Sequence, residues 1–200
     1  MKGLFSDTET AIPRIDPSTH SLQVIDYSHH EIHEGDSYTA HFSNITANTD
    51  DHRTAIGLVT SATAKQMHLV ASVSASSPAE FFIYEAPTIN PDVGTQSAIF
   101  NRNRNSTKTS LATDVSAAPT AAKFEAYIEA NLATLAGGTA IEHVILAGGE
   151  GPKAIGGASR GQSEWILDQG VLYVFVLQNI GASANIHEIH LNWYEHTAKD

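Results

Sequence analysis

The densest group of chemically active side chains is the run His-His-Glu-Ile-His-Glu-Gly-Asp at residues 29–36. Alternate side chains share one face of a β-strand, so a strand here would place His29, Glu31 and His33 together. Two imidazoles and a carboxylate are ligands that Zn²⁺ accepts, which makes these residues candidates for a metal site. The run matches no standard metal-binding motif, so the favoured interpretation is a polar turn or a hydrogen-bonded interface, and no cofactor is expected.

Part of this run occurs twice, because His-Glu-Ile-His fills residues 30–33 and again residues 187–190. A second polar group, Asn-Arg-Asn-Arg-Asn-Ser at residues 101–106, carries two arginines in an otherwise acidic chain. A guanidinium pairs with a carboxylate in a bidentate geometry that lysine lacks, which favours contact with a partner over a solvated hairpin loop. The residues expected at an interface are Arg102, Arg104, His30, His33, His187 and His190.

The sequence gives little support for catalysis. The glycine-rich stretch 147–157 lacks the Gly-Lys-Ser/Thr of a phosphate-binding loop, and no helical pattern follows Pro152. The absence of cysteine excludes thiol catalysis and cysteine-based zinc sites. We therefore expect a protein that is not an enzyme.

Runs of strand-forming residues recur from residue 22 onward, separated by clusters of Gly, Pro, Asn, Asp and Ser. Two packed sheets would bury the apolar faces of such strands. The predicted fold is all-β, an antiparallel β-sandwich, with the jelly roll as one form that it could take. The expected strands are residues 22–27, 37–45, 54–60, 67–73, 80–85, 97–100, 140–146, 164–167, 171–177 and 186–194.

The last three expected strands should form an antiparallel meander. Residues 171–177 are apolar at every position, which is typical of a strand covered on both faces near the middle of a sheet. In residues 186–194 the odd positions are mostly apolar and should face the core. The break that ends at Gly170 is typical of a hairpin turn.

Two segments depart from the strand pattern. Residues 117–135 are rich in alanine and carry four large apolar side chains at intervals of three or four, which predicts one short inserted helix. This helix would cap an open end of the sandwich or contact another subunit. Residues 1–20 hold two prolines and few large apolar side chains, which predicts an extended N-terminal arm, with residues 21–200 as a single domain.

Eleven Lys and Arg against 22 Asp and Glu give the 200 residues a formal net charge of −11. This charge repels phosphate backbones and anionic membranes, so neither nucleic acid nor membrane is expected as a partner. No signal-peptide pattern and no 18-residue apolar run are present, which predicts synthesis in the cytosol. Because protonation of the 11 histidines would offset this charge, we expect light scattering to show a sharp change in solubility or assembly between pH 7 and pH 5.

Several short blocks of the sequence resemble a family of tailed-bacteriophage virion proteins. They cover most of the chain outside the N-terminal arm and comprise residues 26–35, 84–85, 101–106, 165–167, 173–180, 184–186 and 191–196. The resemblance implies a capsid decoration (cement) protein with a β-sandwich fold. It also implies a homotrimer on the outer surface of the head, with the major capsid protein as partner and the virion as its final location.

Two other classes of protein stay open. A tail-associated or receptor-binding virion protein would use a similar sandwich to hold a host glycan or protein. A metal-dependent jelly-roll enzyme would use His29, Glu31 and His33, with His187 and His190, and should purify with stoichiometric metal. The fold alone does not separate these classes, because a sandwich supports many functions.

Overall fold

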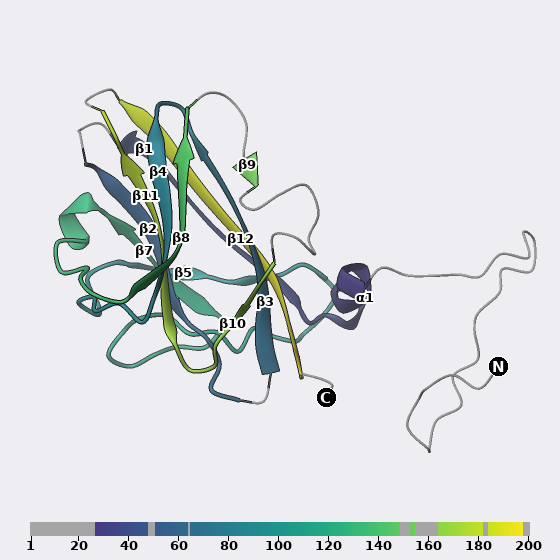
Figure 1. Cartoon of the computed structure of the whole chain (residues 1–200). Helices are drawn as coiled ribbons and strands as arrows, with labels where there is room; N and C mark the ends of the chain where they lie inside the picture. Colours follow the sequence, from purple (N-terminus) through teal and green to yellow (C-terminus); the bar gives the residue numbers. More distant parts are fainter. Residues whose placement is uncertain are drawn as a thin grey trace, which may run out of the picture.

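The strands form two antiparallel sheets that pack face to face (Figure 1). The computed structural model describes residues 27–47, 51–63, 65–148, 153–154, 164–181 and 184–197. The predicted all-β sandwich is confirmed. The arm expected at residues 1–20 lies outside the described residues, as do residues 22–26 of the first expected strand.

The strands divide between the sheets as follows. The first sheet contains β1 (Ser37–Ala47), β3 (Lys65–Ala75), β6 (Phe100–Asn101), β9 (Lys153–Ala154), β10 (Trp165–Leu167) and β12 (Asn185–Thr197). The second contains β2 (Arg53–Val59), β4 (Ala79–Glu85), β5 (Thr95–Ala98), β7 (Lys123–Ile128), β8 (Thr139–Leu146) and β11 (Leu172–Asn179). Helix α1 (Tyr27–Glu34) precedes β1, and the 3₁₀ turn η1 (Glu129–Asn131) follows β7. In the described part of the chain, no helix has the length and apolar character needed to cross a membrane.

Eight of these strands have the connectivity of a jelly roll. The first sheet has the order β10-β3-β12-β1-β6, with β9 also on β3, and the second has the order β5-β7-β2-β11-β4-β8. Strand β1 pairs with β12, β2 with β11, β3 with β10 and β4 with β8, so pairing proceeds inward from both ends of the chain. One long antiparallel hairpin is thus rolled up so that its pairs alternate between the sheets.

Two apolar clusters lie on the two faces of the second sheet. The larger cluster fills the space between the sheets and includes the fully buried Trp193 and Phe175. The smaller cluster, which includes Tyr127, Val174 and Val176, packs against the other face. Strand β11 supplies alternate residues to both clusters and lies between β2 and β4, which confirms a central strand covered on both faces.

The expected meander of the last three strands is wrong. Strand β10 pairs with β3 in the first sheet, β11 lies in the second sheet, and β12 lies between β3 and β1 in the first. The turn that ends at Gly170, with φ +68, therefore connects the two sheets instead of closing a hairpin. The alternation predicted within β12 is confirmed, since Ile189, Leu191 and Trp193 are fully buried.

The helix predicted at residues 117–135 is also wrong. This segment contains β7 and η1, and its apolar residues do not form one stripe. Phe124 packs in the cluster between the sheets, Leu132 packs in the cluster on the outer face, and Ile128 is 40% exposed. The apolar residues are spaced by three or four because β7 carries buried residues on both of its faces and the turn after it adds further apolar residues.

The remaining expected strands are found close to their predicted bounds, with one division. The run expected at residues 97–100 is split into β5 and β6, which lie in different sheets. Ile99, which separates them, is buried in the cluster between the sheets. The chain therefore crosses from the second sheet to the first at this residue.

Candidate functional site

Helix α1 changes the geometry expected for the histidine-rich run. His29 and His33 lie one helical turn apart, with their rings stacked at 4.8 Å and their Nε2 atoms 2.9 Å apart. Glu31 is buried at 6% exposure and lies beside His30, with 3.7 Å between Glu31 Oε1 and His30 Nδ1. The prediction that His29, Glu31 and His33 share one face is wrong, because the segment is a helix and not a strand. Among the described residues, no three His, Asp or Glu side chains are placed to hold a metal together.

The asparagine and arginine loop at residues 101–106 packs beside α1. The Asn103 side chain donates a hydrogen bond to the carbonyl oxygen of His33 at 3.0 Å, and that of Asn101 donates to the carbonyl of Gly35 at 2.7 Å. Gly35 has φ +80, and a Cβ there would overlap Ser106, so glycine permits this close approach. The fold therefore gathers four predicted interface residues at one end of the first sheet, and all four are exposed: His30, His33, Arg102 and Arg104.

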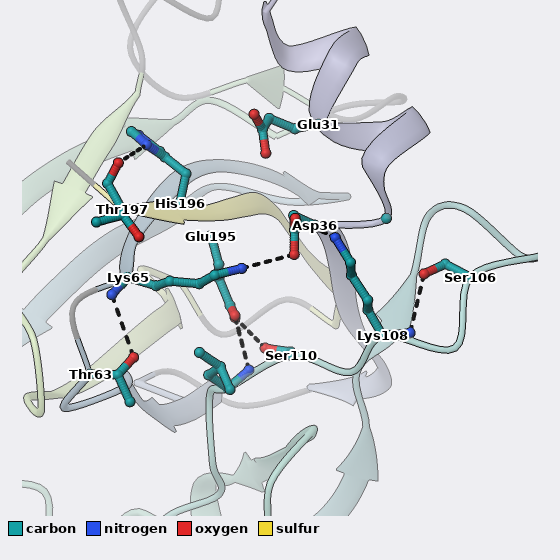
Figure 2. A network of polar contacts seen from close by, with 12 residues as sticks. Glu31, Asp36, Thr63, Lys65, Ser106, Lys108, Ser110, Glu195, His196 and Thr197 are labelled. Carbon is teal, nitrogen blue, oxygen red and sulfur yellow. Dashed lines mark hydrogen bonds and ion pairs between the residues drawn. The ribbon is translucent and has the colours of Figure 1, made fainter. Parts of the chain in front are cut away.

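Asp36, between α1 and β1, connects the segments that surround the 101–106 loop (Figure 2). Its two carboxylate oxygens accept hydrogen bonds from Lys65 Nζ at 2.9 Å and Lys108 Nζ at 2.8 Å. Burial raises the pKa of Asp36, but the hydrogen bonds and positive charges of Lys108 and Lys65 outweigh burial and hold this pKa below its usual value. One carboxylate thus joins the end of α1 to the start of β3 and to the loop before residue 110.

A second carboxylate, that of Glu195 on β12, is almost completely buried at 3% exposure. It accepts a hydrogen bond from Ser110 Oγ at 2.5 Å (Figure 2). It also accepts from the Leu111 backbone N–H at 3.0 Å and from Trp193 Nε1 at 3.1 Å. All three donors are neutral groups, so these contacts are hydrogen bonds and not ion pairs. Together, Asp36 and Glu195 fix residues 108–111 against the first sheet.

A row of stacked side chains crosses the outward face of the first sheet. Arg104 Cζ lies 5.7 Å from the centre of the Phe100 ring, which lies 6.4 Å from the ring of His41. His41 is directly opposite His190 on the neighbouring strand, and their rings stack at 5.7 Å. We call Arg104, Phe100, His41 and His190 the aromatic ladder. It offers a guanidinium, flat ring faces and imidazole nitrogens to a partner.

His187 is placed differently from the other predicted interface residues. It has 0% exposure and lies between the sheets, so it cannot contact a partner of the folded chain, contrary to the prediction. Because His187 Nε2 faces an amide oxygen, Nδ1 of the neutral ring accepts, and its donor is the Thr54 hydroxyl at 3.0 Å; Thr54 Oγ1 in turn accepts from the Asn44 amide at 3.0 Å. His187 Nε2 donates to Asn179 Oδ1 at 2.8 Å, which satisfies a neutral imidazole completely.

Burial is the main reason that the pKa of His187 falls from 6.5 to about 4, and the nearby His52 contributes a smaller repulsion. This side chain therefore stays neutral at pH 5. The expected titration of all 11 histidines between pH 7 and pH 5 is wrong for His187, because its neutral form is held in the interior.

Sequence reasoning assigned no role to four residues of this region: His41, Phe100, Asp36 and Glu195. The alternation of β1 places His41 outward, but no sequence pattern shows which strand lies beside it. Asp36 and Glu195 carry no local signal, because their partners come from segments distant in sequence.

The described surface also includes a pocket of about 160 Å³ beside Arg53 and Tyr84. Small-molecule sites are usually about 300–1,000 Å³. Arg53 is already engaged, since its Nε and Nη2 donate to the two carboxylate oxygens of Glu129, each at 2.8 Å. The pentapeptide Gly-Ala-Ser-Arg-Gly at residues 157–161 has the spacing of a nucleophile elbow, but it lies outside the described residues.

Comparisons of the chain with family models, curated proteins and solved structures found no match. The function is therefore inferred from the residues and surfaces of this chain.

Proposed function

We propose that the protein is a capsid decoration protein of a tailed bacteriophage, with a structural and non-enzymatic role. After synthesis in the host cytoplasm, it binds the outer surface of the head as a homotrimer and bridges subunits of the major capsid protein. The resemblance of the sequence blocks to virion proteins supports this role, and the jelly-roll sandwich is a fold used by capsid proteins.

The observation that carries the proposal is the aromatic ladder beside the 101–106 loop. Arginine and aromatic residues are enriched in the buried centres of protein interfaces, and they supply most of the strongly contributing side chains. Phe100 is 42% exposed and Arg104 is exposed, so these two residues present such a pair on the surface of a chain with net charge −11. The surface of the shell protein that binds this pair would carry a carboxylate for Arg104 and apolar side chains for Phe100.

A decoration protein stabilises the shell by mass action. A decoration protein that binds only the assembled lattice lowers the free energy of that lattice and leaves the free energy of the dissociated subunits unchanged. A trimer that engages several shell subunits at once adds avidity without requiring a stronger single contact. Closed three-fold symmetry allows the same surface patch to serve all three protomers at a three-fold lattice position.

Binding to undecorated heads tests this proposal. The wild-type protein should sediment with heads assembled without it, saturate, and occupy fixed lattice positions in electron micrographs. The double variant Phe100→Ser with Arg104→Ala should bind at least roughly 30-fold more weakly, because strongly contributing interface residues are worth about 2 kcal/mol or more. The matched control is Ile145→Ser with Lys123→Ala, which removes an exposed apolar side chain and a positive charge from the second sheet.

The outcomes separate the possible roles. Wild-type protein that leaves heads undecorated at saturating concentration would reject the proposal. Binding to host cells in place of heads would favour a tail-associated or receptor-binding role. Equal weakening by both double variants would show that the aromatic ladder is not the contact surface.

A further inference from the structure

One side of strand β1 is open along most of its length. On the other side β1 pairs with β12 from its first residue onward. On the open side, the only strand among the described residues is the two-residue β6, which pairs with Tyr38 and Thr39. The backbone of residues 40–45 therefore borders no described strand there. Unpaired backbone groups at a sheet edge are a template for pairing with another chain.

A hydrogen bond at the start of β1 shows which backbone groups face this open edge. The Arg102 N–H donates to the Ser37 carbonyl at 2.9 Å on the side of β6. In an antiparallel ladder the N–H and C=O of one residue point to the same side, and successive residues alternate. Counted from Ser37, the residues that face the open edge are His41, Ser43 and Ile45. Their side chains are exposed on the outward face of the first sheet.

The segment that immediately precedes α1 has the composition of a strand that could pair here. The described part of the chain begins at Tyr27, so 26 residues precede it. Residues 22–26 read Leu-Gln-Val-Ile-Asp, and valine and isoleucine favour strands. An added strand of this length fits along residues 41–45.

Antiparallel pairing of residues 22–26 with the open edge brings complementary side chains together on the outward face. One register makes three opposite pairs: Leu22 with Ile45, Val24 with Ser43, and Asp26 with His41. Ile45 is 75% exposed in the single chain, so an apolar neighbour would remove apolar surface from water. The third pair joins a carboxylate to an imidazole that can donate to it. Such opposite pairs stabilise a sheet.

The inward face supports the same register. Ile25 would lie opposite Phe42, which is partly buried and packs against the core between the sheets. A shift by one residue would exchange the two faces of the added strand and turn the Asp26 carboxylate toward this core. Because burying an unpaired carboxylate is costly, the shifted register is disfavoured.

The position of α1 favours the edge of a neighbouring copy over the edge of the same chain. Helix α1 lies beyond the start of β1, and β1 runs away from it (Figure 1). Strand β6 pairs with β1 between α1 and the open edge, and Asn103 of the following loop donates to the His33 carbonyl of α1. Residues 22–26 join Tyr27 without a linker, so β6 and its loop obstruct their return to the edge of their own chain.

We propose that residues 22–26 of one copy pair with the open edge of β1 in a neighbouring copy, as an additional antiparallel strand of its first sheet. Main-chain hydrogen bonds supply the affinity of such a contact, and alternate side chains supply its specificity. The donor and acceptor surfaces differ, so the contact is heterologous, and a three-fold rotation closes it into a ring. The ring of three rests on the homotrimer of the proposed function, whereas the strand contact itself needs no phage head.

Cysteine crosslinking of the full chain tests the contact, because the sequence contains no cysteine. The double variant Val24→Cys with Ser43→Cys, treated with a short bismaleimide, should give covalent dimers and trimers on a denaturing gel. The matched control is Val24→Cys with Ile145→Cys, because β8 is the edge strand of the second sheet and Ile145 is 66% exposed. This control should remain largely monomeric.

Proline substitution gives an independent measurement without cysteine. In the proposed register the Val24 N–H faces β1, and proline cannot donate to a ladder. Val24→Pro should therefore change the mass measured by light scattering from that of a trimer to that of a monomer. Thr10→Pro, in the same N-terminal segment but outside residues 22–26, should keep the wild-type mass. Circular dichroism should confirm that both variants are folded.

Three results would overturn the proposal. A crosslink from residue 24 to residue 43 within one chain, identified by mass spectrometry of the monomer band, would place the strand on its own β1. Equal crosslinking at residues 43 and 145 would show that β1 is not the acceptor. An unchanged mass of folded Val24→Pro would show that the pairing does not join the copies. The phage role is tested separately, since crosslinked trimers that leave heads undecorated would reject that role and keep the strand contact.

Discussion

Replacement of Glu195 by alanine should lower the free energy of unfolding by about 3–5 kcal/mol, because it leaves three buried donors without their acceptor. The donors are the Ser110 hydroxyl, the Leu111 backbone N–H and the Trp193 indole N–H. Burying a carboxylate is itself costly, but the cost of three unsatisfied donors is larger than the relief from removing it. Urea denaturation gives the free energy, and the midpoint of thermal unfolding should fall by roughly 10 °C.

The control for this prediction is Glu34→Ala, which removes the same side chain from an exposed position where it lies 3.9 Å from His30. Its effect should stay within about 0.5 kcal/mol, as is usual for surface substitutions. If Glu195→Ala were no more destabilising than Glu34→Ala, the proposed anchoring of residues 110–111 by Glu195 would be wrong.

The stability of the wild type should fall by about 2 kcal/mol between pH 7 and pH 5 on account of His187 alone. The pKa of His187 is about 4 in the folded protein, whereas an unfolded histidine has a pKa of about 6.5. As the pH falls below 6.5, the unfolded chain binds the proton first, so the equilibrium shifts toward unfolding. The stabilisation is therefore fully present above pH 6.5 and is lost as the pH falls toward 4.

Urea denaturation at pH 7.0 and pH 5.0 measures this contribution by difference. His187→Gln removes the titrating group, and its loss of stability between the two pH values should be smaller than that of the wild type by about 2 kcal/mol. His187→Asn serves as a second variant with a shorter amide. His143→Gln, at a half-exposed position on β8, makes the same replacement at the surface and is the control. Equal pH dependence in the wild type and both His187 variants would contradict the assignment.

Local patterns predicted the strands well but not their partners. The continuous apolar run of β11 and the alternation of β12 reflect burial that each strand experiences along its own length, so both can be recognised in sequence. The meander failed because alternation does not specify which strand lies alongside, and the turn at Gly170 suits a sheet crossing as well as a hairpin. The run containing Phe124 and Leu132 was misinterpreted because two separate clusters bury its apolar residues.

In the candidate site, too, single residues could be predicted from the sequence, whereas the contacts between distant segments could not. Arg102 and Arg104 could be selected because arginines are rare in this acidic chain. The ladder that joins Arg104 to His190 depends on the register between β1, β6 and β12, which sequence spacing does not encode. His187 was misplaced although the alternation of residues 186–194 puts it on the core face with Ile189 and Leu191, because the prediction relied on the polar character of histidine and not on its position in the strand.

The position of β12 between β1 and β3 has a consequence for biosynthesis. Strands β1 and β3 are made early, and until β12 is available each presents an edge of unpaired backbone groups to other chains. Pairing Ser37 with Tyr194 requires closure of a loop that spans most of the molecule, which is a slow step. The nascent chain is therefore most prone to misassembly before residues 185–197 leave the ribosome, and completion of the first sheet depends on this last strand.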